Sequence, residues 1–223
     1  MPARTLAIGD IHGCDVALEV LLSRLDLTAD DTLIVLGDVV DRGPNTKRSV
    51  ELLLQARKSC RLVFITGNHE QMMLSAVKGG NLELMWLRYG GLEALESYGG
   101  GYGMIPAEHL EFLGSGCDFC ETPGEIFVHA NLEPEIPLEK QSIELLRWTH
   151  LTGSEPRHPS GRRVICGHTS QKSGRPLLFD GWACIDTFAW GGEWLTCLEP
   201  ATNLVYQARQ RGDFRGGIPL NES

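Results

Sequence analysis

Five short polar segments of the chain each follow an apolar run, and their side chains are of the kinds that bind metal ions or move protons. The most distinctive is Gly67-Asn68-His69-Glu70, which follows the apolar run Leu62–Ile65. Such a run ending in glycine and polar residues is typical of a β-strand that ends at a functional site. The side chains that end the five runs are Asp10 and His12; Asp38, Asp41 and Arg42; Asn68 and His69; His129; and His168.

These side chains predict a site for two divalent cations. Asp10 and His12 are two residues apart, so on an extended segment both point to the same side. Asp38 ends the neighbouring strand and can bridge two ions with its two carboxylate oxygens. Oxygen and nitrogen ligands without a thiolate suit manganese, iron, zinc or magnesium, and manganese is the ion we expect first. The expected ligands are Asp10, His12 and Asp38 for one ion, and Asp38, Asn68, His129 and His168 for the other.

Two such ions, about 3.5–4 Å apart, clamp the attacking and leaving oxygens of a phosphoryl transfer. A bridging water that loses its proton near neutral pH would attack phosphorus in line. His69 adjoins a ligand without being one, so it is the candidate acid that protonates the leaving oxygen, with Asp41 holding its imidazolium. Arg42 and Asn68 are the candidates for contacting the substrate, because the forked guanidinium of Arg42 matches phosphate oxygens.

Each piece taken alone has a simpler interpretation. A single His-Gly or Asp-Gly is usually turn chemistry, and Asp41-Arg42 as a surface ion pair would contribute little. Cys117-Asp118-Phe119-Cys120 has no second cysteine pair or nearby histidine, which favours a structural role over zinc. His109 and His158 are expected to be exposed. The coincidence of five clusters, each at a strand end, favours a functional site.

The elements that must position these side chains begin with alternating strands and helices. Strands are expected at 5–9, 32–36 and 61–65 with helices between them, which predicts parallel strands in an α/β domain. Sites in such sheets lie beyond the carboxyl ends of the strands. Later in the chain a second, more antiparallel sheet is predicted from short strands at 125–129, 163–167, 176–180, 183–187, 194–198 and 203–207.

The chain is predicted to form one domain over residues 1–208, with a helical cap inserted at about 79–122. The cap is rich in glycine, and its aromatic residues between Trp86 and Tyr102 could stack a base or simply pack in the core. From residue 209 to 223 the sequence is polar and glycine-rich, which predicts a mobile C-terminal tail.

Composition limits the partners. The formal net charge is −9, which argues against nucleic-acid binding but not against an anionic substrate, because metal ions reverse the local sign of a site. The sequence contains no run of about 18 apolar residues and no secretory segment, so no membrane partner is expected. Seven irregularly spaced cysteines indicate a reducing compartment, and a cytoplasmic location is expected.

Three of the segments resemble, in the right order, the signature motifs of the metallophosphoesterase superfamily: Gly9–Gly13, Gly37–Gly43 and Gly67–Glu70. The Asp-Arg-Gly in the second and the Asn-His-Glu in the third are similar to its phosphoprotein phosphatase branch. That branch includes bacterial and phage lambda-type serine/threonine phosphatases and symmetrical diadenosine tetraphosphatases. Val128–Ala130 and Gly167–Thr169 resemble the two later histidine motifs.

The resemblance implies a four-layer α-β-β-α sandwich of two mixed sheets, with the dinuclear metal site between them. It also implies a second phosphate-binding arginine. The phage-like pattern has this arginine where the chain has His150, so Arg147 is the substitute candidate, and Arg162 and Arg163 are the alternatives. Phe188 stands where a glycine is common, and the pattern would place this bulky side chain near the substrate.

Three functions are compatible with these motifs. The first is a phosphatase for phosphate monoesters, with phosphoserine or phosphothreonine in proteins as the expected substrate. The alternative is a symmetrical dinucleoside tetraphosphate pyrophosphohydrolase, which would use the same catalytic core on a small nucleotide substrate. A scaffold without catalysis is the third, and the presence of every expected ligand and of His69 argues against it.

Overall fold

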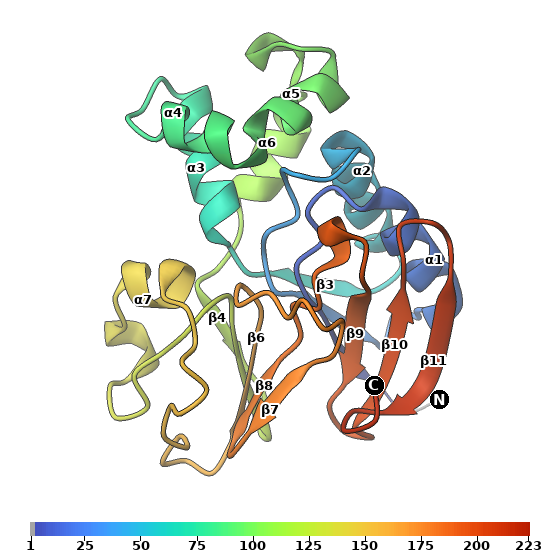
Figure 1. Cartoon of the computed structure of the whole chain (residues 1–223), viewed down its shortest axis with the longest axis vertical. Helices are drawn as coiled ribbons and strands as arrows, with labels where there is room; N and C mark the ends of the chain where they lie inside the picture. The colour runs from blue at the N-terminus through green and yellow to red at the C-terminus, as the bar shows by residue number, and fades with distance from the viewer. Residues whose placement is uncertain (1–2) are drawn as a thin grey trace.

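Two mixed β-sheets form the centre of the computed structural model, which describes residues 3–223 (Figure 1). The six-stranded sheet contains, in order, β11 (Phe214–Pro219), β10 (Leu204–Ala208), β9 (Leu195–Glu199), β1 (Thr5–Ile8), β2 (Thr32–Val35) and β3 (Arg61–Phe64). The five-stranded sheet contains, in order, β4 (Phe119–Glu121), β5 (Glu125–Val128), β6 (Arg163–Cys166), β8 (Trp182–Cys184) and β7 (Leu177–Phe179). Within the first sheet β1, β2 and β3 run parallel, and within the second β5, β6 and β8 do; the other neighbours are antiparallel.

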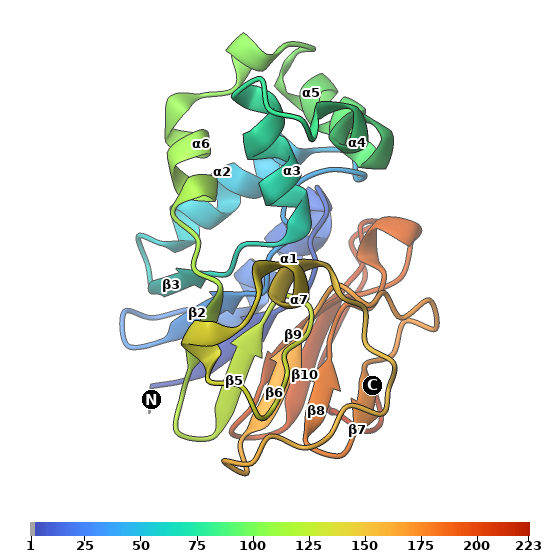
Figure 2. The ribbon, with the colours of Figure 1, turned by 90° about the vertical axis from the view of Figure 1, so that its left-hand side faces the viewer.

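Helices cover the outer faces and one end of the two sheets. Figures 1 and 2 show α3 to α6 gathered beyond the ends of the strands, and α7 beside the five-stranded sheet. The α-helices are α1 (Asp15–Leu25), α2 (Thr46–Ala56), α3 (Asn68–Val77), α4 (Glu83–Trp86), α5 (Leu92–Tyr98), α6 (Ala107–Gly114) and α7 (Ile143–Trp148). The other short helical turns are η1 (Leu87–Gly91), η2 (Tyr102–Met104), η3 (Leu138–Lys140) and η4 (Ala189–Gly191).

Three separate buried clusters define four layers. Side chains alternate along each strand, so Ile8 of β1 packs in the cluster that contains the α1 and α2 side chains, while its neighbour Ala7 faces the second sheet. Likewise Ile165 of β6 lies in the cluster between the sheets, and Val164 packs outward in the cluster that contains Leu146 of α7. The predicted α-β-β-α sandwich of two mixed sheets is therefore confirmed.

The segment from residue 209 onward is not a free tail. Its residues Phe214–Pro219 form β11, which pairs with β10 along its length, and Phe214 packs against the first core cluster. An edge strand needs only one apolar face, so a polar, glycine-rich sequence still pairs there. A Cβ at Gly216 would lie 2.8 Å from ring atoms of Tyr206 and Phe214, so glycine leaves room for these two side chains. The expectation of a mobile tail was wrong.

The inserted region near 79–122 is made of short helices, as its sequence indicates, but its histidine is not on the surface. His109 is buried, and its Nδ1 lies 2.9 Å from the hydroxyl oxygen of Tyr98. The expectation that His109 is exposed was wrong, because its hydrogen-bond partner, Tyr98 on α5, could not be assigned from the sequence. Among residues 3–223, no helix combines the length and the apolar character needed to cross a bilayer.

Asp31 at the start of β2 connects the N-terminal segment to the sheet. Its carboxylate accepts hydrogen bonds from Arg4 Nη2 at 2.7 Å, Arg4 Nε at 3.1 Å and the Thr28 backbone N–H at 2.9 Å. The side-chain hydrogen bonds from Arg4 hold the pKa of this buried carboxyl well below its usual range. Because the folded-state pKa is depressed, the resulting stability is present above about pH 4 and is lost as the pH falls below it.

We therefore expect Asp31→Asn to lower the free energy of unfolding by about 3 kcal/mol at pH 7, because it breaks a buried ion pair. The difference from the wild type should shrink as the pH is lowered from about 4 toward 2. Urea unfolding at several pH values measures both effects. Asp30→Asn, at the exposed neighbouring position, is the matched control. A loss of stability that stays the same down to pH 2 would contradict this assignment.

Candidate metal and catalytic site

The ends of five strands bring the predicted ligands together. The loop after β1 carries Asp10 and His12, and the loop after β2 carries Asp38. Asn68 begins α3 directly after the loop that follows β3, and the loops after β5 and β6 carry His129 and His168. All are buried except His168, which is partly buried. The carboxyl ends of parallel strands meet at one edge of each sheet, and the sandwich places the two edges side by side.

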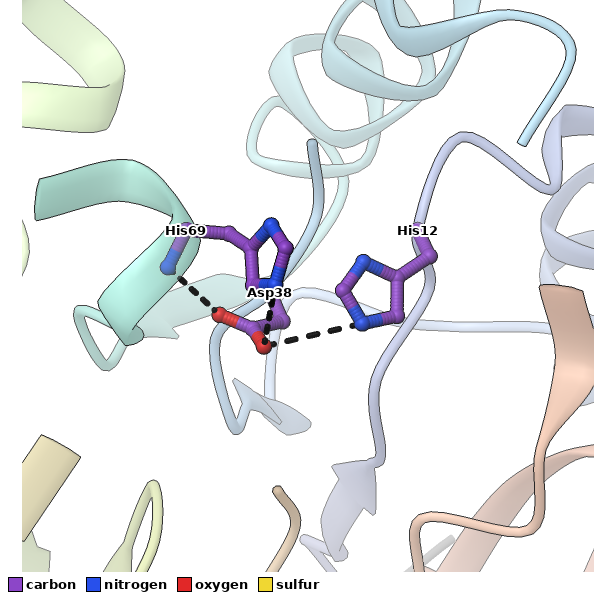
Figure 3. Close-up of side chains that lie close together, drawn as sticks. All are labelled: His12, Asp38 and His69. Atoms are coloured by element: carbon purple, nitrogen blue, oxygen red, sulfur yellow. Dashed lines mark hydrogen bonds and ion pairs between the residues drawn. The ribbon is translucent and has the colours of Figure 1, made fainter. Parts of the chain in front are cut away.

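Asp38 lies at the centre of the cluster, with its two carboxylate oxygens facing different imidazoles. Its Oδ2 is 3.6 Å from His12 Nε2, and its Oδ1 is 3.5 Å from His129 Nε2. Figure 3 shows Asp38 between His12 and His69. Burial alone would raise the pKa of Asp38, but the imidazoles of His129, His69 and His12 hold it well below its usual range. One carboxylate thus faces two groups of nitrogen ligands.

The hydrogen bonds of the histidines leave ring nitrogens that suit a cation. Nδ1–H of His12 donates to the Val40 carbonyl at 2.9 Å, and Nδ1–H of His129 donates to the Leu36 carbonyl at 2.7 Å. Burial lowers the pKa of both rings, which favours their neutral form with Nε2 unprotonated. The Nε2 of His12 lies 3.0 Å from Arg42 Nη1. His129 Nε2 then lies 3.1 Å from Asn68 Oδ1, which places two acceptors together without a proton between them. A metal ion satisfies both, so the donor set fits a metal site.

Two groups of side chains could each hold one ion, since their ligand atoms lie within 4.8 Å of one another: His12, Asp38 and His69, and Asp38, His129 and His168. The second group, with Asn68 beside it, matches the predicted set. The first contains His69 in place of Asp10. His69 Nε2 lies 4.0 Å from Asp38 Oδ2, and Asp10 Oδ2 lies 4.0 Å from His12 Nε2, so both flank the same space.

Asp10 is held in place by the backbone of the last histidine motif. The N–H of His168 lies 3.1 Å from each of its carboxylate oxygens. A Cβ at Gly167 would come within 2.1 Å of Asp10 Oδ1, so only glycine fits there. Burial, with the nearby carboxylates of Asp186 and Asp38, raises the pKa of Asp10 well above its usual range. A cation would stabilise this concentration of buried negative charge.

His69 and Asp41 form a buried pair. Nδ1–H of His69 donates to Asp41 Oδ2 at 2.7 Å, and the other carboxylate oxygen accepts the indole N–H of Trp86 at 2.8 Å. Burial lowers the pKa of His69, but Asp38 and Asp41 outweigh it and raise the pKa above its ordinary value. The predicted acid and its orienting carboxylate are therefore in hydrogen-bond contact.

The backbone of the site is strained. His12, Asp38, Asp41, Arg42 and His168 have φ angles of 45°, 48°, 74°, 65° and 62°. Residues other than glycine adopt this left-handed conformation at a cost of roughly 1–3 kcal/mol each. Such strain gathers where the surrounding structure fixes side chains for function.

Glu70 holds the backbone of the site together, a role that the sequence interpretation missed. Its buried carboxylate accepts the backbone N–H groups of Gly67 and Asp38 at 2.9 Å and of Val39 at 2.8 Å. It thereby connects the loop after β2 to the start of α3. The signal was present, because a glutamate three residues after a helix N-cap commonly turns back to bind N–H groups there. A Cβ at Gly67 would lie 2.1 Å from Asp38 Oδ1, so this glycine is required as well.

The structure does not bring the candidate second arginines to the site. Arg147 Nη2 pairs with Asp118 Oδ1 at 2.6 Å, and Arg162 and Arg163 form ion pairs with Glu121 and Glu125. None of the three lines the cavity beside the ligand cluster, which has a volume of about 590 Å³. That cavity is lined by Asp38, Arg42, Asn68, His69, Met72, Met85, Tyr89, Trp148, His150, His168, Thr169, Ser170, Lys172, Phe188 and Trp190. Among these lining residues, Arg42 is the arginine and Lys172 is the lysine.

Known proteins resemble this chain in sequence and in fold. The symmetrical bis(5'-nucleosyl)-tetraphosphatase of Delftia acidovorans is 44% identical over 73 residues, which are 32% of this chain and 25% of that protein. The enzyme of the same name from Cellvibrio japonicus is 40% identical over 76 residues, which are 34% of this chain and 27% of that protein. The chain thus matches about a quarter of the length of these curated relatives.

Two solved structures share the fold over almost the whole chain. A proposed diadenosine tetraphosphatase is 20% identical with a TM-score of 0.71, covering 98% of this chain and 96% of that one. A cold-active protein-tyrosine phosphatase of a Shewanella species is 20% identical with a TM-score of 0.65, covering 98% and 81%. The sequence-family model of the calcineurin-like phosphoesterases matches residues 3–180 of this chain. The chain belongs to the calcineurin-like phosphoesterase family.

Proposed function

We propose that the protein is a metal-dependent phosphoesterase that hydrolyses small nucleotide substrates, with symmetrical dinucleoside tetraphosphates as the leading candidate. The observation that carries this proposal is the composition of the 590 Å³ cavity. One side holds the metal-ligand cluster and His69, and the walls hold Tyr89, Trp148, Phe188 and Trp190. Aromatic faces stack nucleobases without regard to sequence, at about 1–3 kcal/mol per base.

The residues of the site have separate tasks in this reaction. Two divalent ions, of which manganese is the first to test, would be held by Asp10, His12, Asp38, Asn68, His129 and His168. When bound, such ions polarise phosphoryl oxygens and supply a nucleophilic water near neutral pH. His69, oriented by Asp41 through its Nδ1–H, would deliver a proton from Nε2 to the leaving oxygen. Arg42, whose guanidinium lies 4.9 Å from the centre of the Trp190 ring, would contact phosphate oxygens.

The phosphoserine and phosphothreonine phosphatase that the motifs also suggest would use the same catalytic groups. The names of the matched relatives and the aromatic walls of the cavity favour the nucleotide substrate. Turnover of diadenosine tetraphosphate, a phosphopeptide and p-nitrophenyl phosphate should be compared on the full chain with added manganese. The highest kcat/KM is expected for diadenosine tetraphosphate, with ADP as its product. A higher kcat/KM for the phosphopeptide would overturn the nucleotide assignment.

Lys172 is expected to bind the substrate phosphates that lie beyond the scissile one. It is exposed at the wall of the cavity, which Arg147, Arg162 and Arg163 do not line. Because one charge-assisted hydrogen bond contributes about 1.5 kcal/mol or more, Lys172→Ala should raise KM for diadenosine tetraphosphate about tenfold. The effect on p-nitrophenyl phosphate, with its single phosphate, should be smaller. Lys140→Ala, exposed on η3, is the control. Equal effects of Lys172→Ala on both substrates would exclude this role.

A further inference from the structure

The cap region makes direct contact with the acid pair through Trp86, the last residue of α4. Trp86 is fully buried, and its indole N–H donates to Asp41 Oδ1 at 2.8 Å, while Asp41 Oδ2 accepts the Nδ1–H of His69 at 2.7 Å. Each oxygen of the Asp41 carboxylate therefore has its own side-chain donor. Neither donor is next to Asp41 in the chain: one comes from the cap and one from the first turn of α3.

A second hydrogen bond joins the same part of the cap to Arg42, the residue that follows Asp41 in the chain. The carbonyl oxygen of Gly90 accepts the backbone N–H of Arg42 at 3.2 Å. Gly90 has a φ of 115°, and a Cβ there would lie 2.5 Å from the Arg42 nitrogen. A Cβ at Gly91 would lie 2.6 Å from the Trp86 ring. Two glycines thus permit the kinked turn that seats Trp86 beside Asp41.

We propose that Trp86 is a positioning residue for the acid step, and that it acts through Asp41. The inference rests on the proposed function, in which His69 protonates the leaving oxygen. A buried carboxylate oxygen that loses its donor carries a desolvation penalty, so the carboxylate of Asp41 would turn to share its bond with His69 between both oxygens. This turn would move the imidazole of His69 away from the position in which it faces the leaving oxygen.

Trp86→Phe tests this role because it keeps an aromatic ring in the buried position and removes the N–H. Two phosphate esters should be compared in manganese: p-nitrophenyl phosphate, whose leaving group needs little protonation, and an alkyl phosphate, whose leaving group needs a proton. We expect the variant to lose about tenfold more kcat with the alkyl ester than with the nitrophenyl ester. KM and the affinity for manganese, measured by calorimetry, should stay at the wild-type values, because no ligand is altered.

Trp182→Phe is the matched control. Trp182 is also buried and also donates its indole N–H, to the Pro156 carbonyl at 3.1 Å, but it packs in the outer cluster of the second sheet. The change should leave the ratio of the two rates at the wild-type value. In an Asp41→Asn background, Trp86→Phe should have no further effect on this ratio, because the group through which it acts is already altered.

Equal losses with both esters, or an unchanged ratio, would overturn the positioning role and leave the phosphoesterase proposal standing. A wild-type chain that hydrolyses neither ester nor diadenosine tetraphosphate would overturn both. Where the phenylalanine variant does not fold, the sulfur isostere benzothienylalanine at position 86, which has the shape of tryptophan without the N–H, decides between the outcomes.

Discussion

Asp38→Ala should lower kcat/KM for p-nitrophenyl phosphate by about a thousandfold or more and should abolish high-affinity binding of manganese. The reason is geometric. Asp38 Oδ1 and Oδ2 face His129 and His12 respectively, so its loss removes a shared ligand from both groups. Asp38 also accepts the backbone N–H of His69 at 3.1 Å, so the acid loses a contact at the same time. Steady-state kinetics and calorimetric titration with manganese measure the two effects.

Asp180 offers a control for this change. Its carboxylate is exposed and does not line the cavity. Asp180→Ala should retain wild-type kinetics and metal binding. Should Asp38→Ala keep both its activity and its manganese affinity, the site described here would not be the catalytic one.

His69→Ala should lower kcat for an alkyl phosphate by about 10²–10³-fold and affect p-nitrophenyl phosphate much less, because the better leaving group departs without a proton. Burial lowers the pKa of His69, but the Asp38 and Asp41 carboxylates raise it above its ordinary value, which favours the protonated imidazole. An acid acts below its pKa, so the wild-type rate should fall as the pH rises through this raised value. The variant should lose that alkaline decline.

The pH dependence of kcat for the alkyl ester, measured for the wild type and His69→Ala, checks this role. Manganese binding should persist in the variant. A complete loss of metal binding would instead make His69 a ligand, in agreement with its place in the group with His12 and Asp38.

The positions of the candidate metal ligands follow from local patterns. Each predicted ligand comes directly after an apolar run, and the carboxyl ends of parallel strands gather at one edge of a sheet. Knowing that Asp10, Asp38 and Asn68 end strands of this kind is enough to expect them close together. The four layers follow from the same alternation, because Ala7 and Ile8 must bury opposite faces.

What the sequence could not supply depends on contacts between distant segments. Arg147 was a reasonable phosphate-binding candidate until its partner was known, and that partner, Asp118, lies 29 positions away. The contact of Trp86 with Asp41 spans 45 positions and arises from a kink in the cap. Side-chain pairs of this kind are set by how elements pack, which no local periodicity reveals.

Crystals of the full chain grown with manganese test the central claim most directly, through anomalous diffraction at the manganese absorption edge. The account predicts two anomalous peaks about 3.5–4 Å apart on either side of the Asp38 carboxylate, one near His12 and one near His129 and His168. An absence of peaks in this cavity, with manganese bound elsewhere on the chain, would contradict it.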